Sequence, residues 1–157
     1  MGLHVIVLSG MNADDTTTYL NKNGVENIQI LPNQINRCNF VIGKRKPIRV
    51  TLWIALNTKI AQTMYNFIQY RVQNVIFLYD FNKPITLIRA LGWWKATMNQ
   101  DKEIKMVLCS TIVDEANVCR AYDKVISGIS NKFLQFDNNA VPHYSIELKK
   151  IFKNFLN

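Results

Sequence analysis

The stretch Ile48–Asp80 constrains the fold of this chain more than any other part of the sequence. It contains two apolar runs, one ending at Trp53 and one from Val75 to Tyr79, separated by a segment with helical spacing. Apolar runs of about four to eight residues are typical of strands that are buried on both faces of a parallel sheet. A strand, a helix and a second buried strand make a βαβ unit, so the sequence predicts an α/β fold.

The same alternation continues on both sides of this unit. The predicted strands are Leu3–Leu8, an edge strand at Ile28–Leu31, a hairpin of Asn39–Gly43 with Ile48–Ile54, then Val75–Tyr79, Ile104–Cys109 and Lys132–Phe136. The predicted helices are one through Thr18–Leu20, then Ile60–Val72, Ile85–Met98, Asp114–Ile129 and Ser145–Leu156. We expect these elements to form a single domain, 1–157, because 157 residues suit one hydrophobic core.

Composition limits the classes of function. The hydrophobic content of 48% is that of a soluble globular protein, and no run reaches the roughly 18 apolar residues of a membrane span. The last five residues, 153–157, contain no cysteine, so we expect no prenyl anchor. The three cysteines, Cys38, Cys109 and Cys119, lack the spacing of metal ligands. Free thiols are typical of a reducing compartment, so we expect a cytoplasmic protein.

A glycine between the first strand and a helix is the setting of a phosphate-binding P-loop, G-x-x-x-x-G-K-[ST]. On that pattern Gly10 matches the first glycine and Thr17 the final hydroxyl, but Asp15 replaces the second glycine and Thr16 the lysine. Asp14 and Asp15 would place negative charge where an anion should bind. The loop therefore suits the start of its own helix better than a phosphate.

From Trp53 to Trp93 the chain resembles small GTPases of the Ras/Rab type, in which a strand ends in Trp-Asp-Thr-Ala-Gly-Gln and a later one in Val-Tyr-Asp. The matching residues here, in an ungapped frame, are Trp53, Thr63, Met64, Tyr70, Arg71, Tyr79 and Asp80. The resemblance implies a P-loop NTPase or small-GTPase-like three-layer sandwich. Its sheet would be mostly parallel and six-stranded, with one antiparallel hairpin strand.

The residues that carry out chemistry in that family are replaced. Ile54, Asn57 and Thr58 stand where the family has its magnesium-binding aspartate, its phosphate-sensing glycine and its catalytic glutamine. The four positions that would bind guanine hold Ser110, Thr111, Ile112 and Val113. Phosphoryl transfer depends on a positioned water and a metal ion, so the resemblance implies a catalytically inactive pseudo-GTPase. We expect no cofactor and no metal site.

We therefore expect a protein-interaction subunit of a larger cytoplasmic assembly, of the trafficking, ciliary transport, cytoskeletal or kinetochore type. The residues predicted to contact a protein partner are Tyr65, Phe67, Tyr70, Trp93, Lys44, Arg45 and Lys46. One alternative is a divergent small GTPase that binds GTP or GDP with Mg²⁺ but does not hydrolyse GTP efficiently. A second is a basic protein of a ribonucleoprotein particle, consistent with the net charge of +8.

Overall fold

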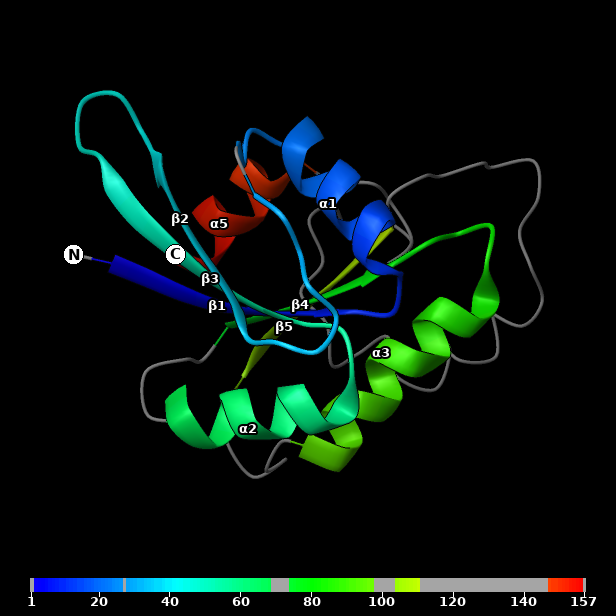
Figure 1. Ribbon diagram of the computed structural model, residues 1–157. Coiled ribbons are helices and arrows are strands. Elements are labelled where there is room, and N and C mark those ends of the chain that lie inside the picture. Colours follow the sequence, from blue (N-terminus) through cyan, green and yellow to red (C-terminus); the bar gives the residue numbers. More distant parts are fainter. Residues whose placement is uncertain (1, 27, 69–73, 98–103, 111–146, 157) are drawn as a thin grey trace.

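A computed structural model gives the fold and describes residues 2–26, 28–68, 74–97, 104–110 and 147–156 (Figure 1). The described residues contain five strands: β1 (Gly2–Ser9), β2 (Asn36–Ile42), β3 (Ile48–Ala55), β4 (Asn74–Tyr79) and β5 (Lys105–Ser110). They form one mixed sheet in the order β2-β3-β1-β4-β5. The predicted α/β class is confirmed, and the predicted strand Lys132–Phe136 lies outside the described residues.

The sheet is parallel except at one edge. β1 pairs in parallel with β3 and with β4, and β4 pairs in parallel with β5. β2 pairs antiparallel with β3, from Asn36 opposite Ile54 to Ile42 opposite Ile48. The predicted hairpin is therefore confirmed. It begins three residues earlier than the apolar pattern indicated, because Asn36 and Arg37 are polar yet belong to the ladder.

Helices cover both faces of this sheet, which gives three layers (Figure 1). The helices α1 (Ala13–Lys22) and α5 (Leu148–Leu156) lie on one face. The helices α2 (Thr58–Ile68) and α3 (Pro84–Thr97) lie on the other. Pro84 is the first residue of α3, a position where a helix needs no amide hydrogen. No helix in the described ranges is long and apolar enough to span a membrane.

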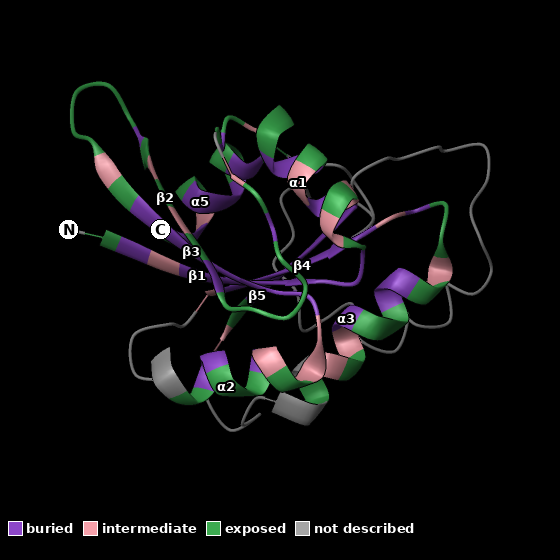
Figure 2. Cartoon of the chain, in the orientation of Figure 1, coloured by how far each residue is buried: buried purple, intermediate pink, exposed green. Residues whose placement is uncertain are grey.

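Each face of the sheet has its own core, and the central strands are buried on both (Figure 2). Ile6, Phe77 and Tyr79 pack toward α2 and α3. Val7 and Ile76 pack toward α1 and α5 with Phe152. Alternate residues of one strand thus reach opposite cores, which explains why the central strands are continuous apolar runs.

Two sequence predictions are wrong in detail. Ile28–Leu31 is not a strand: its Ile30 is buried as a single anchor, with its backbone N–H 3.3 Å from Thr17 Oγ1. Helical spacing in Ile85–Met98 predicts that Ile88 shares one face with Leu87 and Leu91, but Ile88 is 50% exposed, because Leu87 and Ala90 form the buried face of α3. A short apolar run does not by itself indicate a strand, and a single apolar position in a helix does not show whether its side chain is buried.

Candidate functional site

The carboxyl edge of the sheet provides the candidate site. The chain leaves β1 for α1 on one face and leaves the adjacent strand β3 for α2 on the other face. Ligands of open α/β sheets bind in the crevice at such a reversal. A cavity of about 560 Å³ lies there. It is lined by Gly10, Met11, Asn12, Ala13, Asp14, Pro32, Leu56, Arg89 and Trp93.

The loop from β1 to α1 is too short to be a phosphate cradle. Helix α1 begins at Ala13, so Asp15 and Thr16, predicted at the glycine and lysine positions of the P-loop, lie inside its first turn. Asn12 caps the helix, and its Oδ1 accepts the Asp15 N–H at 2.8 Å. Asp14 and Asp15 suit the positive end of the helix dipole. Their negative charges would repel a phosphate bound at the start of this helix.

Several backbone amides of this loop already donate to protein acceptors. The Gly10 N–H donates to Leu78 O at 3.0 Å, and the Met11 N–H donates to Ser9 Oγ at 3.2 Å. The Thr16 N–H donates to Asn12 O at 3.1 Å. An anion-binding loop points its amides at the ligand. These amides instead stabilise the strand end and the helix start.

The two threonines predicted at the P-loop have structural partners. Thr16 is fully buried, and its hydroxyl donates to Asn12 O at 2.8 Å. Because that hydroxyl has one hydrogen, its 2.8 Å contact with Ser9 Oγ must be donated by Ser9. Thr17 donates to Ala13 O at 2.8 Å and accepts the Ile30 N–H. Both hydroxyls therefore support the fold, and Thr17 ties the segment before β2 to α1.

Gly10 is required for packing between two elements. A Cβ at this position would overlap the carbonyl group of Thr86 and lie 2.9 Å from its Cα. Thr86 cannot retreat easily, because its Oγ1 donates to Lys83 O at 2.6 Å and accepts the Asp80 N–H at 2.9 Å. The glycine thus lets the first turn of α3 approach the end of β1. This contact explains the glycine without any phosphate.

The segments on either side of the β2–β3 hairpin are joined directly. Asn57 Nδ2 donates to Pro32 O at 2.7 Å, while Asn57 Oδ1 accepts the Ile60 N–H at 2.9 Å and caps α2. Asn36, 8% exposed, accepts the Leu31 N–H at 2.9 Å and donates to Leu31 O at 2.8 Å. Its Nδ2 also lies 3.0 Å from Gln34 O. These two asparagines hold residues 31–36 in place. The sequence predicts neither the Asn57–Pro32 contact nor the Asn36–Leu31 contact.

The residues after Trp53 are part of the core. Ile54, predicted in place of a magnesium-binding aspartate, is fully buried, and Leu56 is 8% exposed. Thr58, in place of the catalytic glutamine, is the first residue of α2. The side chain of Ile54 packs in the same core as α1 and α5. No oxygen ligand is available at this position.

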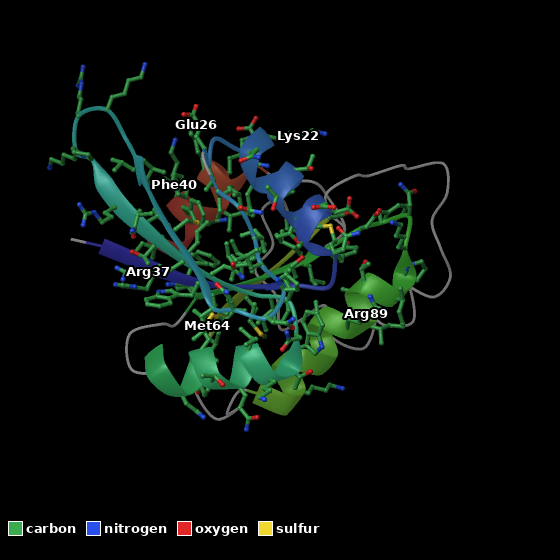
Figure 3. All side chains as sticks on the ribbon, in the orientation of Figure 1. Lys22, Glu26, Arg37, Phe40, Met64 and Arg89 are labelled. Atoms are coloured by element: carbon green, nitrogen blue, oxygen red, sulfur yellow. The ribbon has the colours of Figure 1, made fainter. Side chains whose placement is uncertain are left out.

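The charges around the cavity are mixed. Arg89, an exposed residue of α3 (Figure 3), contributes a cation to the lining and Asp14 contributes an anion. Asp15 Oδ2 lies 3.9 Å from Lys83 Nζ, with both side chains about half exposed. A nucleoside triphosphate with Mg²⁺ needs a lysine, free amides and a hydroxyl or carboxylate for the metal. The residues described here do not fit that ligand.

The remaining predicted site residues are dispersed. Ser110 is fully buried at the end of β5, while Thr111 and Val113 lie outside the described residues.

Trp93 is half-buried and lines the cavity from α3. Phe67 belongs to the last turn of α2, and Tyr70 lies outside the described residues. The exposed residues Lys44, Arg45 and Lys46 form the tip of the β2–β3 hairpin, away from the cavity.

Tyr65 does not lie on an exposed docking surface. It is 5% exposed in the core beneath α2, and its hydroxyl has no hydrogen-bond partner in the described part of the chain. Burying an unpaired hydroxyl costs about 1–3 kcal/mol, so we expect Tyr65→Phe to raise the free energy of unfolding by about 1 kcal/mol. Urea denaturation measures this change.

The matched control is Tyr19→Phe, because the Tyr19 hydroxyl is buried with Cys109 Sγ at 3.0 Å. Removing a paired hydroxyl should lower the free energy of unfolding by about 0.5–1 kcal/mol. A loss of stability in Tyr65→Phe similar to that in the control would show that the Tyr65 hydroxyl has a partner.

Burial raises the pKa of the Cys38 thiol to about 11. The thiolate is the reactive form, so at pH 8 we expect Cys38 to react with iodoacetamide about a hundredfold more slowly in the folded than in the urea-unfolded protein. Below the unfolded-state pKa the thiol is neutral in both states and stability is unaffected. Above it the unfolded state ionises first, so folding stability falls as pH rises from about 9 to about 11. Mass spectrometry of the Cys38 peptide measures the rate, and equal rates would contradict the burial.

Within the described ranges, no three His, Cys, Asp or Glu residues are placed to hold a metal ion. Comparison of the chain with protein-family models and with curated proteins gives no match.

Proposed function

We propose that this chain is a nucleotide-independent protein-interaction subunit of a cytoplasmic assembly, built on a degenerate small-GTPase-like fold. The observation that carries the proposal is the 2.7 Å hydrogen bond from Asn57 Nδ2 to Pro32 O. In an active GTPase of the family that the sequence resembles, the two corresponding segments are organised by the γ-phosphate and its Mg²⁺. Here the Asn57 side chain joins the two segments. The surface that these segments form therefore does not depend on a bound nucleotide.

Three further features support the proposal. The loop amides of Gly10 and Met11, and the Thr16 amide in the first turn of α1, donate to the protein itself. The first turn of α1 carries Asp14 and Asp15 where a phosphate would have to bind. The position of the magnesium-binding aspartate holds the buried Ile54. A module that keeps one conformation is suited to holding a partner and not to switching.

Nucleotide binding provides the test. Denaturing the purified protein should release no guanine or adenine nucleotide. Millimolar GTP with Mg²⁺ should leave the melting temperature unchanged, since a ligand stabilises only the state that it binds. Hydrogen–deuterium exchange over 31–36 and 57–60 should also be the same with and without GTP. A stoichiometric nucleotide, or slower exchange in both segments when GTP is added, would overturn the proposal.

One observation favours the alternative of a divergent nucleotide binder. The cavity of about 560 Å³ lies at the crevice where α/β folds bind ligands, and Arg89 lines it. Under this alternative Arg89 would supply the phosphate contact that the missing lysine does not. Arg89→Ala would then abolish a thermal shift produced by GTP, whereas the main proposal expects no shift in either protein.

A further inference from the structure

In the part of the chain that the structure describes, β2 is an edge strand of the sheet. β2 is the first strand of the sheet, and within the described residues it pairs with β3 alone. Seven consecutive residue pairs, from Asn36–Ile54 to Ile42–Ile48, leave no bulge in the strand, and Asn36–Ile42 contains no proline. Bulges and prolines are two of the means by which proteins protect an edge strand. Within the described residues, the second row of backbone donors and acceptors of β2 therefore has no strand partner.

Apolar side chains accompany this edge. Val41, on β2, is 57% exposed, and no large hydrophobic side chain in the described part of the chain is more exposed. Ile35, just before β2, is 37% exposed, and Leu31 is 39% exposed. Phe40 is half-buried and packs inward against the ring of Phe152. An added strand would cover these exposed groups while it pairs with the β2 backbone.

The surroundings of the edge are strongly basic. The sequence has no Asp or Glu between Glu26 and Asp80. Exposed cations of the hairpin are Arg37, Lys44, Arg45, Lys46 and Arg49. Figure 3 shows side chains of the hairpin tip extending away from the helices. A charge pattern of one sign selects a partner of the opposite sign.

The charge also argues against the simplest other occupant, a second copy of this chain. Antiparallel pairing of β2 with itself would bring together two basic hairpins of molecules that each carry a net charge of +8. Like charges across an interface are a means of excluding a wrong partner. The same cations would attract an acidic strand.

We propose that the β2 edge binds an extended acidic segment of a partner protein as an additional strand of the sheet. Backbone hydrogen bonds to β2 supply the pairing, Val41 contacts an apolar residue of the segment, and the cations Lys44–Lys46 contact its carboxylates. This inference rests on the proposed function, because it names the class of partner that the module holds. It places that partner at the hairpin and not at the cavity.

The test uses the full chain and a fluorescein-labelled peptide of about ten alternating Glu and Val residues. Fluorescence anisotropy at about 0.1 M salt measures binding. Lys44→Glu/Lys46→Glu should weaken binding about tenfold or more. The matched control is Lys149→Glu/Lys150→Glu, which makes the same charge change on exposed residues of α5 and should have less than about a threefold effect.

A second peptide separates strand pairing from simple charge attraction. Methylation of alternate backbone nitrogens keeps the carboxylates but removes the N–H donors of one edge, so this peptide should bind about tenfold more weakly. Equal binding of both peptides would overturn the proposal, as would equal losses in the two double variants. Tighter, hairpin-dependent binding of oligouridylate would assign the surface to RNA. A dimer in sedimentation equilibrium that the peptide does not dissociate would assign the edge to a second copy.

Failure of this inference is distinct from failure of the proposed function. No peptide binding, together with no effect of GTP, overturns the β2 edge as the docking surface and leaves the nucleotide-independent module standing. A thermal shift with GTP overturns the proposed function whatever the peptide does. Protection of β2 amides from hydrogen exchange in the peptide complex would support the edge directly.

Discussion

Gly10→Ala should destabilise the protein by about 3 kcal/mol or more, because the new methyl group would overlap the carbonyl group of Thr86. The neighbouring atoms are backbone, fixed by the hydrogen bonds of the Thr86 hydroxyl to Asp80 and Lys83. Relief therefore requires α3 to move away from the end of β1. Urea denaturation, without nucleotide, measures the change in the free energy of unfolding.

Gly92→Ala is the matched control for this substitution. Gly92 also belongs to the described region, in α3, and a Cβ there would meet nothing within 4 Å. Alanine is the better helix former, so this variant should gain about 0.5–1 kcal/mol. If Gly10→Ala were as stable as the control, the close approach of α3 would be refuted and a role for Gly10 in ligand binding would regain support.

Asn36→Ala should lower the free energy of unfolding by about 2–3 kcal/mol. The substitution removes three part-buried hydrogen bonds of 2.8–3.0 Å, which join the Asn36 side chain to the backbone of Leu31 and Gln34. Residues 31–36 would then lose their attachment to the start of β2. Denaturation gives the stability change, and hydrogen exchange at the Leu31 amide reports the loosening directly.

Asn39→Ala, in the same strand, controls for the change of residue type. Asn39 is exposed, and its Oδ1 accepts one hydrogen bond from Thr51 Oγ1 at 2.8 Å. We expect a loss below about 1 kcal/mol. Equal losses in the two variants would mean that the Asn36 contacts together contribute no more than the single Asn39–Thr51 hydrogen bond.

The sequence predicts the strands whose environment leaves little choice. Leu3–Leu8 and Val75–Tyr79 lie between two layers of helices, so all of their residues except the partly buried His4 are apolar or aromatic, and the pattern is clear. Ile28–Leu31 misleads because isolated buried residues such as Ile30 give the same short apolar run. Ile88 misleads because small residues such as Ala90 form part of the buried face of α3.

The site is less predictable because its contacts join residues that are distant in the chain. The position of Gly10 between a strand and a helix is visible in the sequence, but its contact with Thr86 is not. Asn57 has the sequence signal of a helix N-cap, three residues before Ile60. Its bond to Pro32 has no such signal. Tyr65 is predicted to contact a partner but is buried in the core. The sequence misleads here because aromatic residues are common both in cores and at interfaces.

The central position of β1 has a consequence for folding during synthesis. β1 lies between β3 and β4, so Ile6 is opposite Trp53 on one side and Val75 on the other. At about 5–20 residues per second, a ribosome needs several seconds to extend the chain from the first of these residues to the last. During that time this apolar central strand has no neighbours, and this nascent segment is the one that a chaperone would have to protect from aggregation.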